Sequence, residues 1–70
     1  MYERWSKDDL QFLIEAIKTF GKDYKRVVLE FGKKFNYVQV VTQIYSLKMK
    51  MMRRPEIMDK KFFDIIQGGS

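Results

Sequence analysis

The chain has 70 residues, a formal net charge of +5 and neither cysteine nor histidine. A chain of this length forms one small domain with little room for an enclosed substrate cavity, and it lacks disulfides, the usual zinc ligands and the common nucleophiles and general bases. We therefore expect no enzyme, no cofactor, no metal ion and no small-molecule substrate. No apolar run approaches the roughly 20 residues that span a bilayer, which predicts a soluble protein with no membrane contact.

The first predicted element is a helix over about residues 7–20. Ser6 is suited to cap its free amides, and Asp9 stands at the position that completes a capping box. Gly21 is suited to end the helix in a left-handed conformation. Apolar residues follow at helical spacing, namely Leu10, Leu13, Ile14 and Ile17.

Two further helices are predicted from caps and periodicity. Asp23 is suited to cap a second helix that stops at Gly32, with a buried face of Tyr24, Val27, Val28 and Phe31. Asn36 is suited to cap a third helix, with Gln39 at the capping-box position. The β-branched residues of this segment would also suit a strand, but strict alternation of polar and apolar residues fails, so a helix is favoured.

Pro55 ends the third helix and suits the first turn of an additional C-terminal helix. The apolar face of that helix consists of Met58, Phe62, Ile65 and Ile66. We expect this face to fold back onto an apolar row of the third helix, Val40, Leu47 and Met51, with docking on a partner helix as the alternative. The expected units are residues 1–54, the additional helix at 55–67, and a flexible tail or linker remnant at 68–70.

The stretches WSKDDLQFLIEAIKTFGKDY and VQVVTQIYSLK carry a resemblance to a known family. Over roughly residues 4–50 the chain resembles a SANT/Myb-like domain, and FGKDY followed by VQV is similar to the chromatin-associated SANT type found in CoREST and Cramped proteins. The resemblance implies an all-α fold, a three-helix, homeodomain-like helix-turn-helix bundle. It also implies one core aromatic per helix, here Trp5, Tyr24 and Tyr45, and Val41, Ile44 and Tyr45 are expected to point into the core.

The chain departs from the family pattern at several positions. Two of the family's three Trp positions are Tyr, and Phe35-Asn36-Tyr37 replaces the usual Arg-Thr before the third helix. These departures weaken the transfer of sequence-specific DNA reading from the family to this chain.

A polar stripe runs along the third helix at positions that the resemblance places on the groove-facing side. These expected base-facing residues are Gln39, Thr42, Gln43 and Ser46. Gln can contact adenine through two hydrogen bonds, and Thr or Ser can contact a base or a phosphate. Residues at the two ends of the helix are expected to contact phosphates, namely Lys33, Lys34, Lys48, Lys50, Arg53 and Arg54. An ordinary solvated helix face is the alternative.

Positive charge is concentrated in the middle of the chain, since residues 21–54 carry nine basic and two acidic side chains. Such an excess attracts polyanions, although a solvated lysine-rich surface is the plain alternative. We expect a non-enzymatic, nuclear module that binds double-stranded DNA and acts as an adaptor in chromatin or transcription regulation. The alternative is a SANT-type protein-interaction module that binds histone tails or a subunit of a chromatin-modifying complex.

Overall fold

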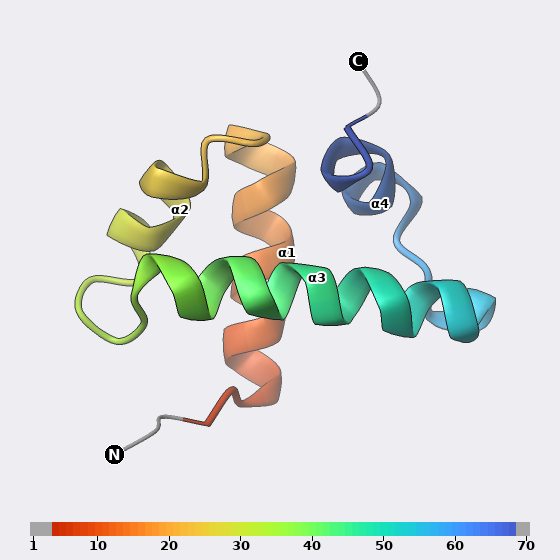
Figure 1. The fold of residues 1–70 in the computed structure, drawn as a ribbon, viewed down its shortest axis with the longest axis horizontal. Helices are drawn as coiled ribbons and strands as arrows, with labels where there is room; N and C mark the ends of the chain where they lie inside the picture. The colour runs from red at the N-terminus through yellow and green to blue at the C-terminus, as the bar shows by residue number, and fades with distance from the viewer. Residues whose placement is uncertain (1–3, 69–70) are drawn as a thin grey trace.

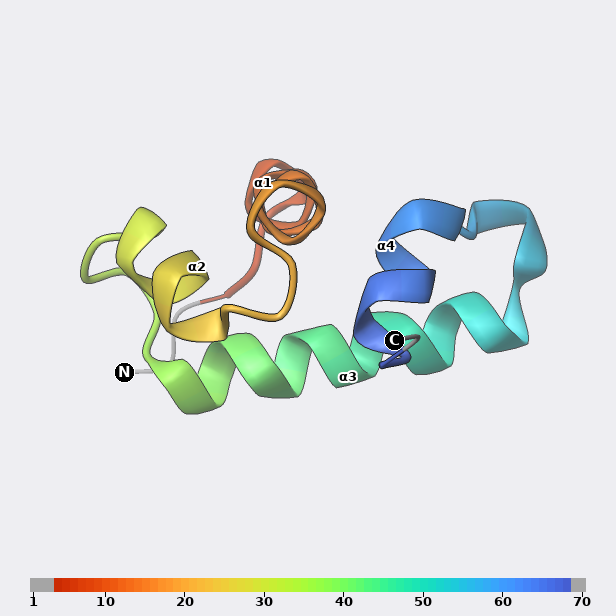
Figure 2. The ribbon, with the colours of Figure 1, turned by 90° about the horizontal axis from the view of Figure 1, so that it is seen from above.

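The computed structural model describes residues 4–68, and all regular structure in that range is helical. The elements are α1 (Lys7–Phe20), α2 (Tyr24–Glu30), α3 (Tyr37–Arg53), the 3₁₀ turn η1 (Pro55–Ile57) and α4 (Lys60–Ile66). In Figure 1, α3 crosses in front of α1, with α2 and α4 on opposite sides of the upper part of α1. Figure 2 shows that α1, α2 and α4 all lie on the same side of α3. The fold class is therefore all-α. Of the expected tail, only Gly68 lies within the described residues.

The start of α1 has the capping box that the sequence predicts. Ser6 Oγ accepts the Asp9 N–H at 3.1 Å, and the Asp9 carboxylate accepts the Ser6 N–H at 3.0 Å. These bonds pair amides that the first turn of a helix leaves without partners. Lys34 Nζ lies 3.0 Å from the other Asp9 oxygen, so the loop before α3 is tied to the start of α1. Gly21 has a φ of 68° as expected, but its ψ of −138° lies outside the left-handed helical region.

The core is built on one row of α3. Its members recur every three or four residues and are at most 5% exposed, namely Val40, Ile44, Leu47 and Met51. They share a single apolar cluster with buried residues from the rest of the chain. These are Leu13, Ala16 and Ile17 of α1, Val27 of α2, Phe35 of the loop before α3, and Phe62 of α4. Burial of each large aliphatic or aromatic side chain contributes about 1.5–3 kcal/mol, so this row determines how α3 is oriented.

Tyr45 is not part of the core, and its assignment as a core aromatic is wrong. Its side chain is 62% exposed, and Val41 is only half-buried, so Ile44 alone of the three residues expected to point inward is buried. Successive residues of an α-helix are about 100° apart around the axis. A helix that buries Val40, Ile44 and Leu47 therefore turns Tyr45 toward solvent.

Trp5 has aromatic partners that the family pattern does not imply. Its ring stacks on Phe35, with centroids 3.8 Å apart and planes 4° from parallel. Phe31 meets both rings edge-on, at 5.4 Å from Trp5 and 5.3 Å from Phe35. Trp5 and Tyr24 are both partly buried against the core, as expected for structural residues. The aromatic cluster thus joins the segment before α1 to the two ends of the α2–α3 connection, without Tyr45.

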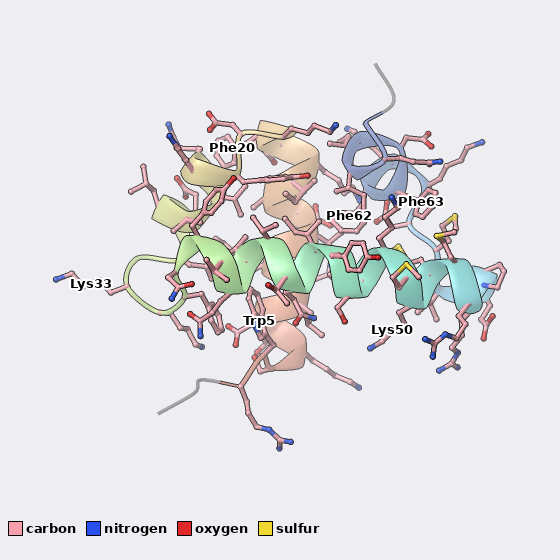
Figure 3. The ribbon with its side chains drawn as sticks, in the orientation of Figure 1. Trp5, Phe20, Lys33, Lys50, Phe62 and Phe63 are labelled. Carbon is pink, nitrogen blue, oxygen red and sulfur yellow. The ribbon has the colours of Figure 1, made fainter. Side chains whose placement is uncertain are left out.

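The segment after Pro55 folds back, and α4 packs against α1 and α3. Phe62 is fully buried, and Figure 3 shows it between α3 and α4. Asp59 Oδ1 accepts the Phe62 N–H at 3.1 Å, and Lys18 Nζ of α1 lies 3.0 Å from Asp59 Oδ2. Of the two arrangements expected for this apolar face, packing on the same chain is the one observed. Met58 is the exception, because Pro55 starts a 3₁₀ turn and Met58 lies exposed before α4.

We expect Phe62→Ala to lower the free energy of unfolding by about 3–5 kcal/mol, because it removes a fully buried ring from the shared core. Chemical denaturation measures the loss. Tyr45→Ala is the matched control, since it removes an aromatic ring from an exposed site and should change stability by only about 0.5 kcal/mol. Equal losses in the two variants would mean that α3 is rotated differently about its axis.

Acid should weaken the start of α1. The hydrogen bond from the Ser6 N–H lowers the pKa of Asp9, burial partly opposes this, and Lys34 lowers it further, so that the pKa lies below its ordinary value of 3.8. A carboxyl group whose pKa is depressed by folding contributes fully above its unfolded pKa, and the contribution is lost as the pH falls through the folded value. Stability should therefore fall as the pH is lowered below about 4.

Melting temperatures of the wild type and of Asp9→Asn between neutral and strongly acidic pH test this expectation. Asp9→Asn should be less stable at neutral pH and less sensitive to acid. Asp8→Asn, at an exposed neighbouring position, is the control and should keep the acid sensitivity of the wild type. An Asp9→Asn variant with the full acid sensitivity would show that protonation of Asp9 does not cause the loss of stability in acid.

Candidate nucleic-acid interface

The longest open surface belongs to α3, because the other helices all lie on its opposite side (Figure 2). None of its 17 residues is acidic. Two lines of side chains run along this surface with the same spacing. Each residue of one line directly follows a residue of the other in the sequence, so the two lines lie about 100° apart around the helix. We call them the polar strip, which is Gln39, Ser46, Lys50 and Arg53, and the apolar row, which is Val38, Tyr45, Met49 and Met52. Thr42 lies between them.

The four residues expected to face bases are not equivalent in the structure. Thr42 and Ser46 are exposed and help to line a shallow, solvent-open depression of about 570 Å³. The other lining residues are Tyr45, Met49, Lys50, Arg53 and Arg54. Gln43 is half-buried at the inner edge of the polar strip. Thr42 and Ser46 are therefore the best placed of the four to meet a ligand.

Gln39 is engaged in the cap of α3. Its Oε1 accepts the Asn36 N–H at 2.9 Å, while Asn36 Oδ1 accepts the Gln39 N–H at 2.8 Å. A two-bond contact with adenine requires both the oxygen and the amino group of the side chain. The Asn36 N–H holds that oxygen at the start of α3. A bidentate contact with adenine would therefore require the oxygen to leave the cap or to accept a second hydrogen bond.

The expected phosphate-contacting residues also divide into groups. Lys33, Lys50 and Arg53 are exposed and form no ion pair with any residue in the range 4–68. Lys33 lies in the loop before α3 and Lys50 toward the other end of the helix, as Figure 3 shows. Lys34 pairs with Asp9, and Lys48 is half-buried.

Arg54 completes the set, and it pairs with Glu56. The distance between Arg54 Nε and Glu56 Oε2 is 3.2 Å, and both side chains are mostly exposed. An exposed pair of this kind is worth at most about 1 kcal/mol, so Arg54 can exchange Glu56 for another anion at little cost.

Sequence reasoning missed the apolar row. Val38 is 69% exposed, Met52 55% and Met49 39%, and Tyr45 belongs to the same line. The signal was present, because these four residues have the spacing of the polar strip shifted by one position. It was hidden by the assignment of Tyr45 to the core and by the number of apolar residues in α3.

Two other classes of site find no support in the described part of the chain. Between residues 4 and 68, no helix combines the length and the apolar character needed to cross a bilayer. In the same range, no three His, Cys, Asp or Glu side chains come together in a way that could hold a metal ion.

No protein-family model, curated protein or solved structure matches the chain. The surface of α3 and the residues that set its orientation are therefore the features from which a function can be inferred.

Mutations can test whether Asn36 and Gln39 stabilise α3 through its capping box, independently of any contact with bases. Asn36→Ala should lower the free energy of unfolding by about 1 kcal/mol, and Gln39→Ala by about 0.5–1 kcal/mol, because each removes one of the two reciprocal bonds. Gln39→Glu keeps an acceptor at the same place and should retain the stability of the wild type. If Gln39→Ala has no effect in chemical denaturation, the side chain is not held in the cap and its whole amide is available to a base.

Proposed function

We propose that the chain is a SANT/Myb-like helix-turn-helix module that docks α3 on double-stranded DNA. The observation that carries the proposal is the open side of α3, which has no acidic residue and exposes Lys50 and Arg53. A surface of this kind attracts a duplex through the release of counterions that are condensed on the phosphates. Because α1, α2 and α4 lie behind α3, a duplex can approach without displacing them (Figure 2).

The dimensions of α3 suit this role. A helix of 17 residues is about 25 Å long, whereas the major groove is about 12 Å wide, so the ends of α3 reach the phosphates that border the groove. In the proposed complex Lys33 contacts phosphates at one end, and Lys50 and Arg53 contact them at the other. Thr42 and Ser46 face base edges in between. With small hydroxyl side chains at the centre, the module binds with modest sequence preference.

The proposed module carries out no chemistry of its own, and it acts as an adaptor in chromatin or transcription regulation in the nucleus. Its sequence resemblance to chromatin-associated SANT domains and its basic surface both support this placement. Binding to histone tails is a less favoured function, because those tails are rich in Lys and Arg and would meet a helix that has no acidic residue. A different protein partner is favoured by the apolar row.

Titration of the chain with a random-sequence duplex at several salt concentrations tests the proposal. The logarithm of the binding constant should fall with the logarithm of the salt concentration, with a slope of about −0.9 for each phosphate contact. Lys50→Ala and Arg53→Ala should each reduce that slope by about one unit and weaken binding to all duplexes alike. Lys25→Ala, at an exposed position of α2, is the control and should leave the slope unchanged.

Absence of binding at low salt would contradict the proposal outright. If Lys25→Ala reduces the salt dependence of binding as much as Lys50→Ala does, the duplex is held by net charge and not by α3. A duplex affinity that is unaffected by Lys50→Ala and Arg53→Ala would exclude the polar strip as the contact surface.

A further inference from the structure

The apolar row is an unusual surface for so small a protein. Val38, Tyr45, Met49 and Met52 recur at intervals of three, four or seven residues and form one line about 21 Å long on a solvated helix. Single exposed apolar residues are ordinary, but an exposed line of large ones marks a surface that meets another molecule.

The helices of the same chain do not cover the row. Figure 2 shows α1, α2 and α4 on the opposite side of α3, where the buried row of the helix faces them. α4 is held there by the buried ring of Phe62 and by the ion pair between Asp59 and Lys18. No helix in the range 4–68 therefore covers the apolar row.

The charges beside the row determine what kind of molecule fits it. Lys48 borders one side of the row, because it is three residues after Tyr45 and four before Met52. Arg53 borders the other side, because it is four residues after Met49. With no carboxylate in α3, a partner gains by bringing acidic side chains to both margins. A second copy of the chain would instead bring the same cations into contact with these.

The residue types indicate a helical partner. Apolar anchors at intervals of three, four and seven residues match those of an amphipathic helix that lies along another helix. Methionine side chains adapt their shape to such partners, and Tyr supplies a large contact area with little loss of conformational freedom. The depression beside Tyr45 and Met49 is bordered by Lys50, Arg53 and Arg54, so it can receive an apolar side chain whose neighbours are acidic.

We infer that the apolar row is a docking surface for an acidic amphipathic helix of a partner protein. The row and the polar strip face about 100° apart, and Arg53 is common to the two surfaces because it belongs to the strip and borders the row. The inference does not depend on DNA binding.

The experiment is a selection from a library of random, helix-forming peptides displayed on phage, with the intact 70-residue chain immobilised. The enriched peptides should combine apolar residues at intervals of three or four with Asp or Glu on both sides. One enriched peptide is then synthesised, and its affinity for the chain and its variants is measured by fluorescence anisotropy.

The double variant Tyr45→Ser, Met49→Gln should bind that peptide at least about tenfold more weakly, and Lys48→Glu, Arg53→Glu should do the same through charge. Leu29→Ser, at an exposed apolar position of α2, is the matched control and should bind normally. All the substituted residues but the half-buried Lys48 are exposed, so melting temperatures close to that of the wild type verify that the variants are folded.

Three results would overturn the inference. The first is a selection that enriches no peptides, or enriches basic ones. The second is an enriched peptide whose affinity is unchanged by the Tyr45→Ser, Met49→Gln variant. The third is self-association of the chain, measured by sedimentation equilibrium, that this variant abolishes, because a second copy would then be the occupant of the row.

Discussion

The rotation of α3 about its own axis is the constraint on which the other features of this protein depend. The helix contains more apolar residues than one face can bury, and the row that it buries is Val40, Ile44, Leu47 and Met51. α1 and α2 cover part of that row, and α4 completes the cluster with the ring of Phe62. Once this row is inside, every other side chain of α3 has its direction determined, including those that form the polar strip and the apolar row.

Short-range caps and long-range contacts act on the same residues. Asp9 closes the capping box of α1 and also receives Lys34 from the loop before α3. Asp59 caps α4 and also receives Lys18 of α1. Burial alone would raise the pKa of Asp59, but these hydrogen bonds hold it below its ordinary value. A helix of seven residues such as α4 is not stable alone, so its cap and its contacts with α1 and α3 must form together.

The open side of α3 combines two kinds of surface. The polar strip carries hydroxyl groups and cations, which suit a polyanion, and the apolar row suits a protein. Gln39 illustrates how local structure constrains a side chain, since its oxygen accepts the Asn36 N–H in the capping box of α3. The residues proposed to face bases are the small ones, Thr42 and Ser46, and the cations at the two ends of α3 supply most of the proposed affinity for DNA.

Signals that act over three or four residues predicted the starts of α1, α2 and α3, but not the start of α4, because Pro55 begins a 3₁₀ turn and Asp59 caps α4. Ser6 and Asn36 cap α1 and α3 as predicted, and Pro55 follows the end of α3. Periodicity also predicted a polar line along α3. It did not show which of those side chains bond to neighbouring residues, as Gln39 does with Asn36. The packing of Phe62 on the same chain was one of two expectations, whereas the tertiary structure was needed to show that Tyr45 faces solvent and that Phe35 stacks on Trp5. The physical reason is that a cap is a bond between near neighbours in the chain, whereas burial is a competition among all apolar faces for the same interior.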